Sequence, residues 1–333
     1  MNKGIYTLAN DVVYDQLVAL LNSIEVNLGK DFPVCVIPYD DRLQKIYPEI
    51  EKRQNVRLLD NSEIIKRWED FSVQIWQKHP TAFKDWQSRE ITGVNRMGMH
   101  RRFCVFDPDS PFEEFVFLDG DILVLNSFDR IFQQLNNNDI VVYDYQYKDP
   151  SHVYDVTSPK LFTIFEKSRI ESEIFCAGFY CSKRGLFNKE NRNWLLKQLD
   201  NGEAEILYPN GPDQSILNYI TMRLGLSVYN FSHHLSLEEK TGNSVTSPHF
   251  EYRNNLLYDK TLRLTYLHYI GVSSKAFTKV CAGENIDFPY RDIFLHYRFL
   301  KSPEDKPQFI GKPQPLKPKV NLWQKIGRKL NLK

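Results

Sequence analysis

Two carboxylates, Asp119 and Asp121, interrupt an apolar stretch of the chain, with only Gly120 between them. The flanking residues 115–118 and 122–125 are apolar, which predicts a buried strand through the stretch. A buried charge is costly unless it is paired or binds a metal. Because side chains at positions i and i+2 of an extended chain point the same way, both carboxylates can converge on one cation, and Gly120 would let a ligand approach the backbone.

Hard oxygen donors of this kind suit Mg²⁺ or Mn²⁺, with a substrate phosphate sharing the ion. The alternative is a turn at a strand end, in which the two carboxylates are solvated or accept hydrogen bonds from neighbouring N–H groups. The choice between these interpretations depends on the elements that surround the pair.

Those elements alternate between strand and helix patterns. Residues 4–9 and 34–37 are short apolar runs, and the apolar residues between Tyr14 and Asn27 have helical spacing. This order predicts a βαβ unit, whose strands are normally parallel. Further strands are predicted at 56–59, 139–143, 174–182, 227–231 and 264–269. Further helices are predicted at 43–53, 97–106, 131–135, 191–199 and 213–224, with one or two more in 61–93. The sequence therefore predicts one α/β domain, residues 1–300, with a mostly parallel central sheet flanked by helices.

The composition is that of a globular protein. The chain has 333 residues, of which 42% are hydrophobic, enough for a substantial core. Its net charge of +1 produces no overall positive field, so no nucleic-acid partner is expected. No run of about 18 apolar residues is present, and the N-terminus lacks the apolar core of a signal peptide. The five Cys are scattered, as in proteins of a reducing compartment. A cytoplasmic protein is expected.

The C-terminal tail, residues 301–333, differs from the rest. It holds nine Lys or Arg against two acidic residues, and five Pro that predict an extended linker. Within 320–333, apolar residues recur every four positions from Leu322 to Leu330, beside Trp323 and between cations. This pattern predicts a short amphipathic helix on an anionic membrane surface, which would make the protein peripheral on the inner face of the membrane. The alternatives are a disordered basic end and a helix docked on the protein's own body.

Four segments occur in a characteristic order. They are Tyr6–Asp11, Leu118–Asp121, Gly211–Asn218 and His268–Gly271. Together they resemble nucleotide-sugar-dependent glycosyltransferases of the Rossmann-like GT-A fold, and are most similar to glycosyltransferase family 8, which includes retaining bacterial galactosyl- and glucosyltransferases. The resemblance implies transfer of a hexose from UDP-glucose or UDP-galactose to a glycan or lipid-linked acceptor, with retention of configuration.

The resemblance also implies roles for individual residues. Asp119, Asp121 and His268 would hold Mn²⁺ (or Mg²⁺) together with the diphosphate of the UDP-sugar. His268 taken alone would be interpreted as a core histidine at the end of a strand. The donor-binding residues implied are Thr7, Ala9, Asn10, Asp11, Arg102, Gly120, Cys176, Ala177, Gly271 and Lys275.

Asp213 and Gln214 are implied at the centre of catalysis, with Asp213 on the sugar hydroxyls and Gln214 near the anomeric carbon. An amide is a poor nucleophile, which favours attack of the acceptor on the same face that the phosphate leaves. Three alternatives stay open: Asp213 as a helix N-cap, Arg101 in place of Arg102, and a simple turn at Asn10 and Asp11.

Two departures from the family pattern leave a more distant family of the same fold as an alternative. Cys176 stands where the family has Asn or Ser, and Lys275 is displaced by one residue with no Pro-Trp after it. Two other functions compete. A sugar nucleotidyltransferase would need a Gly-rich N-terminal loop, which residues 4–14 lack. A non-catalytic nucleotide-sugar-binding scaffold at a membrane would not need three metal ligands.

Overall fold

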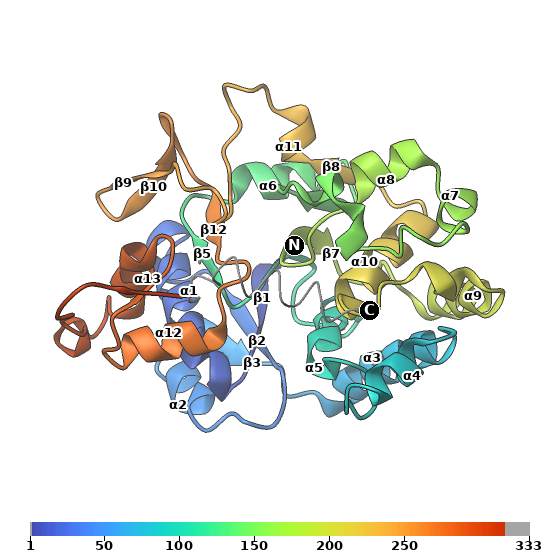
Figure 1. Ribbon diagram of the computed structural model, residues 1–333, viewed down its shortest axis with the longest axis horizontal. Coiled ribbons are helices and arrows are strands. Elements are labelled where there is room, and N and C mark those ends of the chain that lie inside the picture. The colour runs from blue at the N-terminus through green and yellow to red at the C-terminus, as the bar shows by residue number, and fades with distance from the viewer. Residues whose placement is uncertain (1, 317–333) are drawn as a thin grey trace, which may run out of the picture.

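A computed structural model describes residues 2–316, and its centre is a seven-stranded sheet (Figure 1). The strands are ordered β3-β2-β1-β4-β7-β6-β8. Their bounds are β1 Lys3–Ala9, β2 Val34–Pro38, β3 Val56–Leu58, β4 Glu114–Leu118, β6 Ile140–Val142, β7 Phe179–Lys183 and β8 Val228–Asn230. Neighbours are parallel, except that β7 is antiparallel to both β4 and β6. The mostly parallel sheet predicted from the sequence is confirmed.

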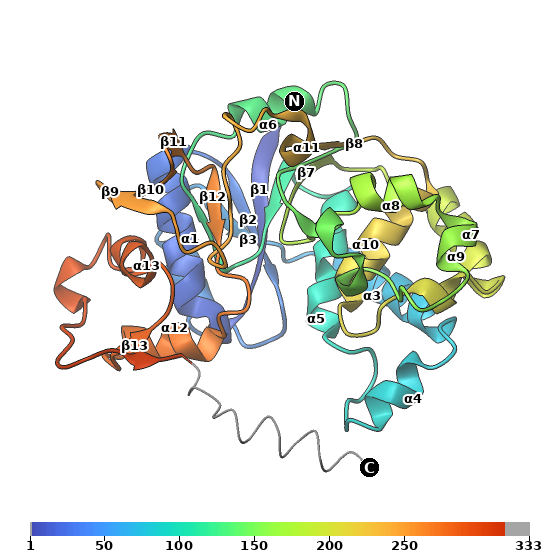
Figure 2. The same ribbon diagram turned by 45° about the horizontal axis from the view of Figure 1, so that its top comes forward.

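Helices cover both faces of this sheet because its strands are apolar on both faces. In β1, Tyr6 and Leu8 pack into one core cluster and Ile5 and Ala9 into the other, since strand side chains alternate. One face carries α1 Tyr14–Asn27, α2 Ile46–Glu51 and α6 Asp129–Gln134. The other carries α3 Ser62–Gln77, α4 Ala82–Gln87, α5 Met97–His100, α7 Leu161–Ile164, α8 Lys167–Glu173, α9 Lys189–Asp200 and α10 Pro212–Arg223. Figure 2 shows α1 and α10 on opposite sides of β1.

The stretch 115–125 does not form one strand, so the prediction of a single strand was wrong. β4 ends at Leu118, and β5, Ile122–Val124, leaves the main sheet to pair antiparallel with β12, Tyr266–His268. A turn separates the strands, closed by the N–H of Ile122 donating to the carbonyl of Asp119 at 3.1 Å. Asp and Gly favour turns over strand interiors, which accounts for the break. The predicted helix 97–106 is likewise divided into α5 and a 3-10 helix, Arg101–Phe106.

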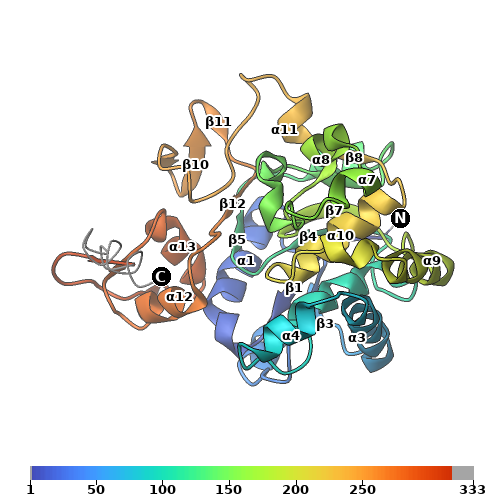
Figure 3. The same cartoon turned by 45° about the vertical axis from the view of Figure 1, so that its right-hand side comes forward.

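The C-terminal part of the chain packs beside α1 (Figures 1 and 3). After α11, Phe231–His234, it contains the remaining elements: β9 Glu251–Arg253, β10 Leu256–Asp259, β11 Leu262–Arg263, α12 Ser274–Cys281, β13 Ile286–Asp287, α13 Arg291–Arg298 and β14 Gln314–Pro315. β14 pairs with β13, and the Arg291 guanidinium lies over the Phe309 ring. The amphipathic helix predicted for 320–333 lies outside the described residues. Between residues 2 and 316, no helix has both the length and the apolar character required to cross a membrane.

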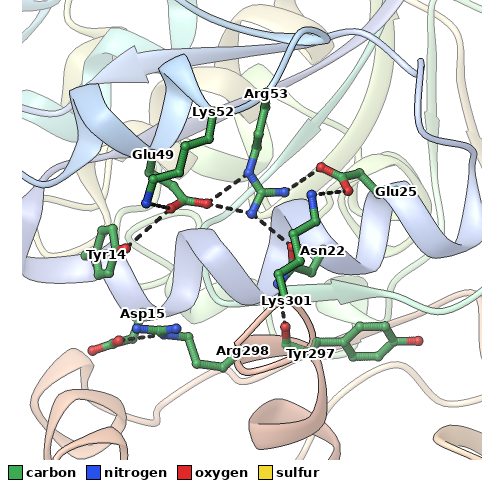
Figure 4. A network of polar contacts seen from close by, with 10 residues as sticks. All are labelled: Tyr14, Asp15, Asn22, Glu25, Glu49, Lys52, Arg53, Tyr297, Arg298 and Lys301. Carbon is green, nitrogen blue, oxygen red and sulfur yellow. Dashed lines mark hydrogen bonds and ion pairs between the residues drawn. The ribbon is translucent and has the colours of Figure 1, made fainter. Parts of the chain in front are cut away.

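A polar network joins α1, α2 and the C-terminal part (Figure 4). At its centre is Arg53, whose side chain is only 2% exposed. Its guanidinium lies 2.5 Å from a Glu25 carboxylate oxygen and 2.6 Å from one of Glu49, and donates to Asn22. The contacts that extend the network to α13 and beyond are Asn22 Nδ2 to the Tyr297 carbonyl, Arg298 to Asp15, and Lys301 to Glu25. The network thus anchors the C-terminal part to the N-terminal helices.

We predict that Arg53→Met lowers the free energy of unfolding by about 3 kcal/mol, because it leaves two nearly buried carboxylates without their shared guanidinium. Lys52→Met is the matched control. Lys52 also contacts Glu49, but its side chain is 68% exposed, so a change below about 1 kcal/mol is expected. Urea unfolding of both variants measures the difference. Equal, small changes would show that Arg53 does not stabilise the fold.

Candidate functional site

Asp119, Asp121 and His268 meet at the carboxyl edge of the sheet. Asp119 directly follows β4 and Asp121 directly precedes β5, while the pairing of β5 with β12 sets His268 opposite Ile122. One ligand atom from each of the three lies within 4.8 Å of the other two. His268 Nε2 is 3.3 Å from Asp121 Oδ1. Two carboxylates and an imidazole therefore face one point, which is a donor set that suits Mn²⁺.

Gly178 leaves the space into which these side chains fit. A Cβ added at this position would lie 2.6 Å from His268 Cε1 and 2.9 Å from Asp119 Oδ2. The carbonyl of Gly178 also accepts a hydrogen bond from the N–H of Asp119, at 2.8 Å. The residues present therefore fit a divalent metal ion: oxygen and nitrogen donors converge in a cradle that any side chain at position 178 would fill.

Arg102 holds the surrounding carboxylates in place. Its side chain is 1% exposed, with Nη2 3.0 Å from Asp119 Oδ1 and Nε 3.0 Å from Asp213 Oδ2. Nη1 donates to the carbonyl of Ala177, and the guanidinium lies over the Phe117 ring. All three nitrogens are thus engaged by the protein. These contacts give Arg102 a positioning role, and direct contact of Arg102 with a donor stays a prediction.

The alternative Arg101 points elsewhere. Its guanidinium pairs with Glu69 at 2.7 Å and donates to the Pro38 carbonyl. It lines neither of the cavities described below.

Asp213 and Gln214 lie in the first turn of α10 and face the same site. Asp213 is not the N-cap of this helix, because that position is Gly211 and no side chain caps it. Gln214 bridges two segments: its Oε1 accepts the N–H of Ala177 at 3.0 Å, and its Nε2 donates to the carbonyl of His152 at 3.2 Å. Its amide group is therefore fixed at both ends.

Burial and nearby charges shift the pKa values of Asp213, Asp119 and His268 from their ordinary values. Burial opposes ionisation of Asp213, but Arg102 and His100 outweigh it and lower the pKa of this carboxyl. Burial raises the pKa of Asp119; Arg102 opposes this effect and Asp121 adds to it. Burial also opposes protonation of His268, yet the contact with Asp121 raises its pKa well above the ordinary value. A bound metal ion would take the place of that proton.

Two adjoining cavities meet at the aspartates. The first, about 390 Å³, is lined near the end of β1 by Ala9 and Asn10 and also by Gly120. The second cavity has a volume of about 520 Å³. It is lined by seven further residues of the predicted site: Arg102, Cys176, Ala177, Asp213, Gln214, His268 and Gly271. Asp119 and Asp121 line both. The site can therefore hold a ligand with two parts joined near the carboxylates.

Three predicted donor residues line neither cavity. Thr7 is fully buried within β1, and Lys275 is exposed on α12. The carboxylate of Asp11 accepts hydrogen bonds from the backbone N–H groups of residues 44, 45 and 46, at the start of α2. It therefore has a structural role, in line with the alternative of a simple turn. Asn10 lines the first cavity while its side chain donates to Asp40 at 2.9 Å.

Sequence reasoning missed Asp144, which follows β6 at the same edge of the sheet. Its carboxylate accepts the N–H groups of Cys176 and Gln146, and burial raises its pKa to about 7. A signal was available, because Asp144 directly follows the predicted strand 139–143, but it lacks the second carboxylate two residues away that singled out Asp119. His152, Tyr208 and Asn210 also line the second cavity, from loops whose course had no sequence signal.

We predict that Gly178→Ala weakens Mn²⁺ binding by at least about 10-fold, because the new methyl group must displace His268 or Asp119. Gly120→Ala is the comparison: its Cβ would meet only the Leu8 carbonyl at an ordinary 3.4 Å, so a smaller loss is expected. Electron paramagnetic resonance of Mn²⁺ measures both affinities. Equal affinities for wild type and Gly178→Ala would contradict the assignment of the cradle.

No protein-family model matches the chain, and no curated protein sequence matches it either. Solved structures do. The galactosyltransferase LgtC, in complex with donor and acceptor sugar analogues, matches with a TM-score of 0.50 and 14% identity, over 83% of this chain and 94% of that one. The bifunctional glycosyltransferase WbbM, in its apo form, matches with a TM-score of 0.54 and 15% identity, over 92% of this chain and 52% of that one, so the chain spans about half of its length. The chain therefore has the GT-A glycosyltransferase fold, as its four motifs predicted.

Proposed function

We propose that the chain is a metal-dependent glycosyltransferase that moves a hexose from UDP-glucose or UDP-galactose to a glycan or lipid-linked acceptor, with retention of configuration. A fold alone does not determine an activity, so the site has to carry this proposal. The observation that carries it is the position of Asp119, Asp121 and His268 where two cavities meet. A nucleoside in the first cavity and a hexose in the second would place the diphosphate between them beside the metal ligands.

When bound to Asp119, Asp121 and His268, Mn²⁺ would act as a Lewis acid that stabilises negative charge on the departing diphosphate. Asp213 is ionised and faces the second cavity, where it can accept hydrogen bonds from sugar hydroxyls. Arg102 holds Asp213 and Asp119 at fixed positions, so little reorganisation is needed when the donor binds.

The state of Gln214 supports a same-face mechanism. Both ends of its amide are bonded to backbone groups, which leaves it poorly placed to form a covalent intermediate. In the same-face mechanism, the acceptor oxygen attacks while its proton passes to the leaving phosphate, and the configuration is retained. The nearby carboxylate Asp144 bonds two backbone N–H groups and lines neither cavity. NMR of the product anomer tests retention of configuration, and mass spectrometry for a glycosyl adduct on the protein separates the same-face route from double displacement.

The class of acceptor is inferred from the positive charge of the C-terminal tail. The excess of Lys and Arg in residues 301–333 favours an anionic membrane surface, and therefore a lipid-linked or membrane-proximal glycan.

We predict that UDP binds the full chain in the presence of Mn²⁺ and that Asp121→Asn weakens this binding by more than about 100-fold, because it replaces a charged metal ligand with an amide. Asp292→Asn is the control, since this carboxylate lies on α13 with a side chain that is 77% exposed and lines neither cavity. Isothermal titration calorimetry with and without Mn²⁺ measures the affinities.

UDP binding that does not depend on Mn²⁺ or on Asp121 would contradict the proposed site. Binding without turnover of UDP-glucose or UDP-galactose, in assays of hydrolysis and of transfer to glycan acceptors, would instead favour a nucleotide-sugar-binding scaffold.

A further inference from the structure

Arg96 occupies a position that the sequence did not single out. It lines both cavities, as do Met99, Val272 and the two aspartates Asp119 and Asp121. Within residues 2–316, its guanidinium forms no hydrogen bond or ion pair with another residue. Its charge nevertheless acts on the site, since it is one of the cations that lower the pKa of Asp213. Arg96 is exposed, and a cation with no partner among the described residues, placed where two cavities meet, is suited to an anionic ligand.

The backbone of Arg96 is held in an unusual conformation. Its φ of +55° and ψ of +42° lie in the left-handed region, which residues with a Cβ adopt at a cost. The carbonyl of Arg96 accepts the N–H of Met99 at 2.8 Å. His100 also contacts this carbonyl through Nδ1, while its Nε2 accepts the Trp76 indole N–H at 3.0 Å, which assigns the proton of neutral His100 to Nδ1. Surrounding contacts therefore impose the conformation.

The turn that carries Arg96 is also packed tightly against the first cavity. A Cβ added at Gly98 would lie 2.3 Å from the carbonyl oxygen of Tyr39 and within 2.8 Å of its ring. Tyr39 itself lines that cavity. The close contact fixes the turn relative to the cavity wall, so the direction in which Arg96 leaves the backbone is set before any ligand binds.

Other cations near the cavities are not available in the same way. Arg102 is buried, is paired with two carboxylates and donates to the carbonyls of Met99 and Ala177. Lys275, predicted to reach the phosphate, lines neither cavity. Arg42 lines the first cavity, but its guanidinium is paired with Asp40. Arg96 therefore differs from these three cations: it lies at the boundary between the two cavities, and its guanidinium N–H groups are not bonded to another described residue.

We propose that Arg96 binds the diphosphate of the donor, and of the nucleoside diphosphate released from it, at the boundary that the two cavities share. This inference rests on the proposed function for the identity of the donor. The guanidinium offers paired N–H donors that match phosphate oxygens. It complements the negative charge that grows on the diphosphate as the glycosidic bond breaks, and the left-handed backbone at Arg96 is the structural cost of that placement.

The test compares wild type, Arg96→Asn and Arg96→Lys by calorimetric titration with two probes, UDP and inorganic pyrophosphate, each in the presence of Mn²⁺. Asn tolerates the left-handed conformation, so Arg96→Asn removes the guanidinium and preserves the backbone. We expect it to weaken both probes by about 10- to 100-fold. Arg96→Lys keeps the charge but loses the paired N–H donors of the guanidinium. Its affinities for both probes should lie between those of wild type and Arg96→Asn. The melting temperature of Arg96→Asn should not drop.

Lys260→Asn is the matched control, because Lys260 is also a cation with a left-handed backbone, φ +59°, but is exposed between β10 and β11 and lines neither cavity. It should bind both probes as wild type does. Wild-type affinity of Arg96→Asn for pyrophosphate would overturn the inference, whatever happens to UDP.

If wild type binds pyrophosphate but not UDP, and Arg96→Asn loses pyrophosphate, the inference holds and the proposed uridine donor is wrong. If wild type binds neither probe, both proposals are wrong.

Discussion

A buried guanidinium requires that its charge and its N–H groups be satisfied, and in this molecule that requirement organises the site. Arg102 meets it with Asp119 after β4, Asp213 in α10 and the carbonyl of Ala177 ahead of β7. Three segments that are distant in sequence are therefore held to one group. Removing either carboxylate would leave the buried charge of Arg102 with one partner fewer, which would destabilise the arrangement. The cavities are shaped by the backbone that Arg102 ties together.

Much of this architecture could be predicted because the strands are strongly apolar and the carboxylates stand out against them. The βαβ start, the long helices and the GT-A fold were confirmed. The course of the chain at Asp119 was not predicted correctly. An apolar run with a short polar break does not reveal whether the strand continues in the same sheet. Pairing of β5 with β12 depends on a distant partner, and local pattern carries no information about it.

The candidate site, too, was predictable from the sequence in some residues and not in others. Asp119, Asp121 and His268 were found from residue type and order, and the structure brings them together. The family resemblance implied that Asp11 contacts the donor, yet its oxygens bond the backbone of residues 44–46. Arg96 had no motif to mark it. The role proposed for it rests on its place where two cavities meet and on the absence of a partner among residues 2–316, and both are properties of three-dimensional structure.

The pairing of β5 with β12 has a consequence for the order in which the protein is made. Two of the three candidate metal ligands, Asp119 and Asp121, emerge in the first half of the chain, but His268 comes only with β12, after the sheet and α10 have been synthesised. If a metal ion binds these three side chains, its ligand set is complete only once β12 has paired with β5. Release of β12 from β5 would then open the site and weaken the hold on the ion.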